Sequence, residues 1–175
     1  MPGRLLLILV LGAVAVPAPA AAEPTWPAPA WSAPAWSAPL DGDLRVTRRF
    51  DPPPDPFGAG HRGVDLAGSP GARVLAAGAG VVVFAGMVAG RPVVSIDHPG
   101  GLRTTYEPVV PSVAAGQPVA RGSPIGALSA GHAGCPVAAC LHWGLRRGEV
   151  YLDPLGLVRP VQVRLLPLEG SPGPP

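Results

Sequence analysis

The sequence predicts an all-β domain at residues 41–166, built as a small, mostly antiparallel β-sheet. Short runs of Val, Ile, Leu and aromatic residues follow one another there, separated by Gly, Pro and Asp. No stretch between these glycines and prolines keeps a helical period over three turns. The length is sufficient for one hydrophobic core. Residues 167–175, rich in Pro and Gly, predict a loose C-terminal tail.

Eight segments of the domain are expected to form strands, since Val, Ile and aromatic residues populate them. They are residues 44–50, 63–66, 73–76, 80–85, 92–97, 102–106, 125–128 and 141–145. Turn-forming sequences bound most of these segments, for example at residues 68–71, 86–90 and 98–101.

Residues 1–22 have the pattern of a secretory signal peptide. Arg4 supplies a positive charge, residues 5–16 are apolar, and residues 20–22 are small alanines suited to cleavage. The apolar run is shorter than the roughly 20 residues that span a bilayer. We therefore expect a secreted or cell-envelope protein, and the alternative is a signal retained as a membrane anchor.

Residues 23–40 form a tract rich in Pro and Ala, in which Ala-Pro-Ala-Trp-Ser occurs at 28–32 and again at 33–37. Prolines at this density exclude both a helix and a central strand, so the tract is predicted to be an extended linker. Two interpretations of its tryptophans stay open. The tract is either a plain spacer, or its indoles form a contact for a glycan or a partner protein.

The charge of the chain excludes nucleic acid as an expected partner. Formal net charge is +2, and all 13 basic residues are arginines. Removing Arg4 with the signal leaves 12 arginines against 11 acidic residues, or +1. This balance is too small for a nucleic-acid-binding surface, and the arginines are scattered along the chain.

His61, Asp65 and His142 are candidate zinc ligands. On a straight strand His61 and Asp65 would lie about 13 Å apart, whereas two ligand atoms of one zinc ion lie within about 4.4 Å. The chain must therefore bend between them, and Gly63 permits the bend. Alone, this spacing is also typical of a surface pair. With His142 added, two imidazoles and one carboxylate suit a catalytic zinc that keeps one position open to water.

Cys135 and Cys140 are the two cysteines of the chain. In an exported protein, an even count at close spacing favours a disulfide, which would constrain the segment leading into His142. The alternative is that the Cys140 thiolate is a fourth zinc ligand. That arrangement would close the site to water and exclude catalysis.

A set of short motifs occurs in order along the domain. They are Gly60–Ala67, Gly71–Ala77, Gly80–Val82, Val94–His98, Thr104–Tyr106, Gly116–Val119, Gly122–Gly126 and Leu141–Trp143. Together they resemble the lysostaphin-type (LytM-domain) zinc metallopeptidases, which cut peptide cross-links in bacterial peptidoglycan. The resemblance covers nearly all of residues 41–155. It implies a lysostaphin/LytM fold and a zinc ion held by His61, Asp65 and His142.

The resemblance also shows two departures from active relatives, in which two further histidines line the site. Pro108 stands at the histidine position of a Tyr-Ala-His segment, and Cys140 at the first histidine of His-x-His. Each such donor to a developing negative charge can be worth about 10²–10³ in rate. His132, in the glycine-rich segment 131–134, is the candidate catalytic replacement, because its loop could lie over the metal.

Three further residues near these motifs carry expectations. Tyr106 is expected to line the cleft as a hydrogen-bond donor. Glu107 is expected to point away from the face that Tyr106 shares with Pro108, because side chains alternate along a strand. His98, at a position that the family often fills with histidine, is expected to be structural.

The leading hypothesis is an exported zinc-dependent endopeptidase that acts on peptidoglycan stem peptides or cross-bridges. Pro108 and Cys140 motivate an alternative, a catalytically degenerate domain that binds the cell wall or regulates another hydrolase. A third interpretation is that zinc only stabilises the fold.

Overall fold

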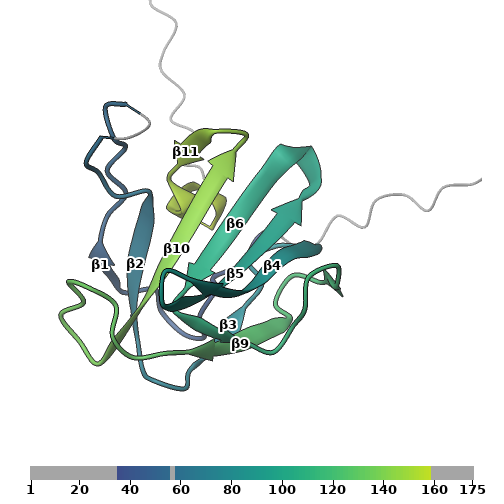
Figure 1. Cartoon of the computed structure of the whole chain (residues 1–175), viewed down its shortest axis with the longest axis horizontal. Helices are drawn as coiled ribbons and strands as arrows, with labels where there is room; N and C mark the ends of the chain where they lie inside the picture. Colours follow the sequence, from purple (N-terminus) through teal and green to yellow (C-terminus); the bar gives the residue numbers. More distant parts are fainter. Residues whose placement is uncertain (1–34, 56–57, 159–175) are drawn as a thin grey trace, which may run out of the picture. The chain divides into compact units, whose positions relative to one another are not determined.

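The computed structural model describes residues 35–55 and 58–158, which form two antiparallel sheets (Figure 1). The larger sheet has the order β1-β2-β10-β6-β5-β4-β8, with β11 paired to β10, and the smaller sheet has the order β3-β9-β7. The strands are β1 (Val46–Arg48), β2 (Gly63–Gly68), β3 (Arg73–Leu75), β4 (Gly80–Val88), β5 (Arg91–His98), β6 (Leu102–Glu107), β7 (Val109–Pro111), β8 (Pro118–Val119), β9 (Pro124–Leu128), β10 (Ala139–Arg147) and β11 (Val150–Leu152).

The expected all-β, mostly antiparallel fold is confirmed. Within the described residues the helices are two short 3₁₀ segments, η1 (Pro99–Gly101) and η2 (Pro154–Leu157). Neither is of a length that could cross a membrane. Glycine and proline fall throughout the described chain and favour turns over a continuous helical ladder.

Each of the eight segments expected to be extended contains a strand: β1 to β6, β9 and β10. The sequence did not predict β7, β8 and β11, which are two or three residues long. Proline is part of both β7 and β8 and argues locally against a strand. These short strands form because a neighbouring strand supplies partners, as β10 does for β11.

The hydrophobic core lies on one face of the larger sheet and takes in the smaller sheet. Alternate residues of β10 point into it, with Leu141 and Trp143 fully buried. From the smaller sheet, Val74 of β3 and Ile125 of β9 belong to the same buried cluster. His142, between the two buried residues of β10, therefore emerges on the opposite face of the larger sheet.

Residues 36–40 belong to this domain, although the sequence placed them in the linker. Leu40 is part of the core, and Trp36 packs against it. Trp36 forms a β-bridge with Gly78, whose added Cβ would lie 2.6 Å from the indole ring. The indole also meets the ring of His98 edge-on, with centroids 4.8 Å apart. Trp36 of the second tryptophan repeat is thus structural, and the domain begins before residue 41.

The remaining expected segments cannot be compared with the structure. The signal at residues 1–22, the linker up to residue 34 and the tail at residues 167–175 lie outside the described residues.

His98 and Tyr106 form a polar network inside the fold. The His98 Nδ1 lies 2.9 Å from the Ala79 carbonyl oxygen, and its Nε2 lies 2.7 Å from the Thr104 hydroxyl. The Thr104 and Tyr106 hydroxyl oxygens are 2.9 Å apart. Burial lowers the pKa of His98, and it raises the pKa of Tyr106 to about 12. Both groups are therefore held neutral, which fits the structural role expected for His98.

We predict that Trp36→Ala lowers the free energy of unfolding by about 2 kcal/mol, because it removes a half-buried indole that covers Gly78 and His98. Urea unfolding followed by circular dichroism measures the change. Val110→Ala is the matched control, since Val110 is 55% exposed. If Trp36→Ala is no more destabilising than this control, residues 36–40 are not part of the folded domain.

Candidate metal centre

Two adjacent strands and the segment before them bring the three candidate ligands together. β2 pairs with β10 so that Asp65 lies directly opposite His142. His61 precedes β2 and is held by two backbone hydrogen bonds with Asp51, of 2.7 and 3.0 Å. The chain turns between His61 and Gly63, where β2 begins. The expected bend between His61 and Asp65 is therefore present, and His142 joins them from β10, as expected.

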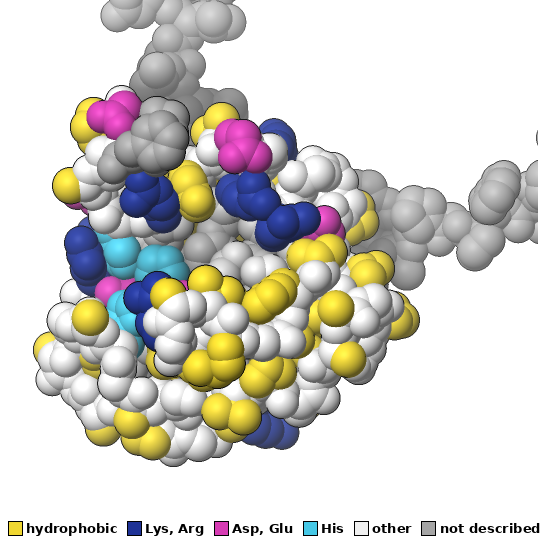
Figure 2. Space-filling model, viewed as in Figure 1, with side chains coloured by type: hydrophobic (Ala, Val, Ile, Leu, Met, Phe, Trp, Pro, Cys, Tyr) yellow, Lys and Arg dark blue, Asp and Glu magenta, His cyan; other side chains and the backbone are white. Residues whose placement is uncertain are grey.

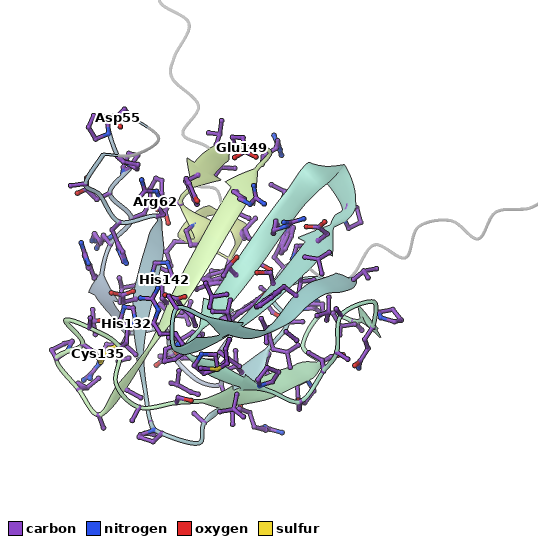
Figure 3. The ribbon with its side chains drawn as sticks, viewed as in Figure 1. Asp55, Arg62, His132, Cys135, His142 and Glu149 are labelled. Atoms are coloured by element: carbon purple, nitrogen blue, oxygen red, sulfur yellow. A yellow bond between two sulfur atoms is a disulfide. The ribbon has the colours of Figure 1, made fainter. Side chains whose placement is uncertain are left out.

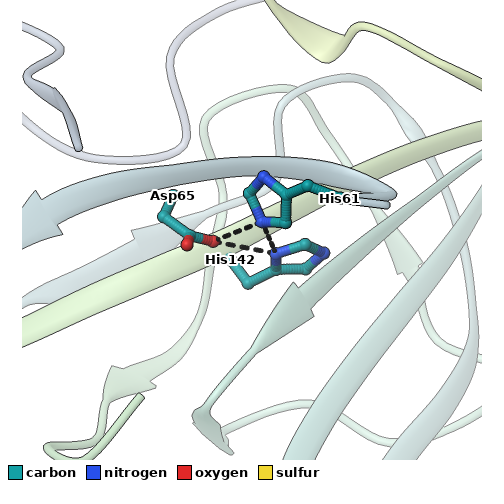
Figure 4. Close-up of side chains that lie close together, drawn as sticks. All are labelled: His61, Asp65 and His142. Atoms are coloured by element: carbon teal, nitrogen blue, oxygen red, sulfur yellow. Dashed lines mark hydrogen bonds and ion pairs between the residues drawn. The ribbon is translucent and has the colours of Figure 1, made fainter. Parts of the chain in front are cut away.

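The ligand atoms converge on one point (Figure 4). The Asp65 Oδ1 lies 3.0 Å from the His61 Nε2 and 2.9 Å from the His142 Nδ1. The two imidazole nitrogens are themselves 3.0 Å apart. Ligands of a tetrahedral zinc ion at about 2.0–2.2 Å are separated by distances of this order. The arrangement is therefore compact enough for one ion.

The surroundings of His61 favour a cation at this point. Its Nδ1 lies 2.7 Å from the Arg49 carbonyl oxygen, which can only accept a hydrogen bond. In the neutral imidazole, the Nδ1 therefore carries the proton, and the Nε2 presents a lone pair to the Asp65 carboxylate. Two sets of lone pairs this close repel each other unless a cation lies between them. The carbonyl behind His61 is also the type of second partner that orients metal-bound histidines.

Asp65 is ionised in this environment. Burial would by itself raise its pKa, but the hydrogen bond with His142 and the electrostatic interaction with three neighbouring histidines lower it, so that the pKa lies below its ordinary value. A carboxylate that stays charged is a suitable oxygen ligand for a divalent ion.

His132 lies beside His142 (Figure 3). Its Nε2 is 3.2 Å from the Asp65 Oδ1, and its ring stacks on that of His142 with centroids 5.8 Å apart. Its other nitrogen, Nδ1, is buried and has no hydrogen-bond partner among the described residues. The loop between β9 and β10 therefore carries a third imidazole to the site, as the sequence led us to expect.

Cys135 and Cys140 form the expected disulfide, with their Cα atoms 5.7 Å apart. The bond closes the loop just after His132 and anchors it to the start of β10. Because both sulfur atoms are in the disulfide, Cys140 is not a thiolate ligand in this structure. The alternative, in which the Cys140 thiolate closes the site as a fourth zinc ligand, is therefore wrong.

Tyr106 does not line the cleft, and this expectation was wrong. Its side chain is fully buried in the core, and its hydroxyl accepts a hydrogen bond from the Ala77 amide at 2.9 Å. Pro108 is buried as well. Glu107 points away from both, as expected, but the face to which it points is the one that carries the metal centre.

The sequence analysis therefore missed Glu107 as a site residue. It pairs directly with His142 across β6 and β10. The alternation of polar Arg103, Thr105 and Glu107 with buried Thr104 and Tyr106 was the signal that could have identified the open face of β6.

A groove of about 340 Å³ runs along this open face, with His142 at one end. Gly144 and Thr105, which also pair directly across β10 and β6, contribute to its floor. The residues lining the groove are Arg62, Arg91, Arg103, Thr105, Glu107, His142, Gly144, Leu145, Arg146 and Tyr151. Figure 2 shows basic side chains beside the histidines around a hollow on this side of the molecule. The arrangement is a candidate metal centre that opens into an extended groove.

Comparison with known proteins identifies the class to which this fold and centre belong. The family model described as Peptidase family M23 matches residues 59–154, which is more than half of the chain. The chain therefore belongs to peptidase family M23.

Among curated relatives, the protein Rv2891 of Mycobacterium tuberculosis is 58% identical over 130 residues, covering 72% of this chain and 52% of the relative. The chain thus spans about half the length of the curated relatives that it matches.

Solved structures show the same fold. A zinc-containing peptidase from Vibrio cholerae is 27% identical, with a TM-score of 0.56, covering 67% of this chain and 38% of that chain. The antimicrobial peptidase lysostaphin from Staphylococcus simulans is 23% identical, with a TM-score of 0.55, covering 66% of this chain and 50% of that chain. The likeness to lysostaphin is one of fold alone.

We predict that the purified chain binds one zinc ion, and that Asp65→Asn and His142→Ala each lower its affinity at least 100-fold. The first replaces a charged carboxylate by a neutral amide, and the second removes an imidazole nitrogen. Elemental analysis and competition with a chromophoric chelator measure content and affinity. Arg121→Gln, at an exposed position outside the cluster, is the control and should bind normally. Normal zinc content in both ligand variants would contradict the assignment.

Proposed function

We propose that this protein is an exported, zinc-dependent endopeptidase that cleaves peptide cross-links of bacterial peptidoglycan. The main observation in support of this proposal is that His61, Asp65 and His142 converge at the end of an open groove. Membership of a peptidase family and the likeness to a zinc-containing peptidase support the chemistry. The signal-like residues 1–22 and a disulfide, which persists in oxidising compartments, support export.

The metal contributes Lewis-acid chemistry when bound: it polarises a carbonyl group and lowers the pKa of bound water. The chain supplies the arrangement that this chemistry needs. His61 is oriented by the Arg49 carbonyl, and Asp65 offers Oδ1 to the centre. His142 completes the set from β10 and faces the groove, where an extended peptide can lie against the sheet.

Two groups besides the ligands are proposed to act on the substrate. The imidazole of His132 lies next to Asp65 and donates a hydrogen bond to the carbonyl oxygen as negative charge develops on it. The carboxylate of Glu107 lies in the groove and accepts the proton of the attacking water. These two residues would perform the tasks for which Pro108 and Cys140 have no suitable groups.

The direct test is incubation of the zinc-loaded protein with purified peptidoglycan, followed by chromatography and mass spectrometry of the soluble products. We expect release of peptide-cleaved fragments by the unaltered chain and by Arg121→Gln, and none by His142→Ala, because that variant lacks a metal ligand. Zinc binding without fragment release from the unaltered chain would refute the enzymatic part of the proposal.

We further predict that His132→Ala and Glu107→Gln each lower kcat about 10²-fold or more while zinc content stays normal. The physical reason is that both variants lose a proton donor or acceptor without losing a ligand atom. Steady-state kinetics on a fluorogenic cross-bridge peptide measure the effect. Thr105→Ser, a conservative change in the floor of the groove, is the control. Unchanged kcat in either variant removes that residue from the mechanism.

The second candidate function is a non-hydrolytic domain that binds the wall or regulates another hydrolase. Its motivating observation is the buried Pro108 and the disulfide-bonded Cys140 at the two positions where active relatives carry histidine. Sedimentation with isolated sacculi separates the two functions. Binding that survives chelation of zinc, together with absent hydrolysis, favours this candidate.

A further inference from the structure

The groove beside the metal centre is strongly basic. Four of its lining residues are arginines, at positions 62, 91, 103 and 146, whereas Glu107 is its one acidic lining residue. The whole chain carries 13 arginines against 11 acidic residues, so the excess positive charge of the groove is local. A cleft lined by one sign of charge raises the local concentration of ligands of the opposite sign.

Two of these arginines face each other across the sheet. Arg103 of β6 and Arg146 of β10 are direct partners in the strand register. Like charges placed directly opposite each other on a sheet repel, and here Asp97 and Glu149 offset part of that repulsion from outside the groove. A bound anion between the two guanidinium groups would reduce it further.

Each of the two groups is held in place from outside the groove. Arg103 forms a two-nitrogen ion pair with Asp97, and Arg146 donates to the Gly148 carbonyl at 2.8 Å and to Glu149 at 3.3 Å. A guanidinium has five N–H donors, so these contacts leave donors available for a ligand. Because the side chains are already ordered, less conformational entropy is lost when a ligand binds.

The other two arginines border the half of the groove nearer to the metal. Arg62 lies over the ring of Tyr151, 5.5 Å from its centroid, and its Nη2 donates to the Gly58 carbonyl at 3.1 Å. Arg91 lies 3.7 Å from the Glu107 carboxylate. At this end the negative charge of Glu107 partly offsets the positive charge of the arginines.

We propose that the groove selects peptides that carry free carboxylate groups, and that Arg103 and Arg146 bind a substrate carboxylate at the end remote from the metal. This inference rests on the proposed function, since it names the substrate chemistry of the same site. Planar guanidinium groups bind carboxylates through paired hydrogen bonds, which a carboxamide cannot accept in the same way.

The strand register sets the position of this carboxylate along the substrate. From His142 to Arg146 the sheet advances four residues, or about 13 Å. A peptide lying extended along the strands covers that length with about four residues. The recognised carboxylate therefore lies about four residues from the bond at the metal.

The test uses two dye-labelled stem peptides, alanyl-γ-D-glutamyl-diaminopimelyl-D-alanine with free carboxylates and the same peptide with every carboxylate amidated. Fluorescence anisotropy measures their binding to the whole chain after removal of zinc, so that binding is separated from cleavage. Circular dichroism verifies the fold, and the same titration with zinc is used if the metal-free chain unfolds. We expect the free-acid peptide to bind at least tenfold more tightly.

Arg103→Gln and Arg146→Gln should each reduce this preference at least fivefold, whereas Arg121→Gln, an exposed arginine outside the groove, should leave it unchanged. Equal binding of the two peptides overturns the inference, and so does an equal loss in all three variants, which would indicate general charge attraction. A preserved preference in a chain that hydrolyses nothing upholds the carboxylate site and refutes only the enzymatic proposal.

Discussion

The pairing of β2 with β10 is the interaction on which the functional part of this molecule depends. One register places Asp65 opposite His142 and Gly63 opposite Gly144, so it creates both the candidate metal centre and the low floor of the groove. A shift by one residue would turn His142 into the core and Trp143 to the open face. Burial of Leu141 and Trp143 therefore stabilises the register and, with it, the position of the ligand.

The same strand pairing gives a structural reason for Cys140 and Pro108 at the two positions where active relatives carry histidine. Cys140 shares a face with His142, and in the disulfide it ties down the loop that carries His132. Active relatives carry a histidine at the position of Cys140. In this chain Cys140 instead anchors the loop that brings His132 to the site. On β6, the chain similarly offers Glu107 immediately before Pro108. The polar groups beside the three candidate ligands thus come from His132 and Glu107 rather than from the two positions that carry histidine in active relatives.

Much of the fold followed from the sequence, because alternating runs of Val, Ile and aromatic residues between turn residues are local signals. The candidate ligands also followed, since the types and spacing of His61, Asp65 and His142 restrict the chemistry. Strands such as β7 and β8 did not, because their stability comes from partners elsewhere in the chain.

The orientation of β6 was the main error in the site. The alternation of residues in a strand defines two faces but does not indicate which face is buried. Tyr106 was therefore assigned to the cleft, although its ring lies in the core. Trp36 was misplaced for a related reason. Proline-rich sequence predicts an extended backbone, and an extended backbone can pack on a domain as readily as it can link two of them. In both cases the missing information was tertiary.

Gly63 limits how this centre can change. A Cβ at this position would lie 2.5 Å from the Trp143 carbonyl oxygen and 2.7 Å from the His142 Nε2. Even alanine would thus push the His142 ring and the neighbouring backbone aside together. Substitutions that alter the site without displacing His142 therefore have to fall elsewhere, on β6 or on the loop that the disulfide anchors.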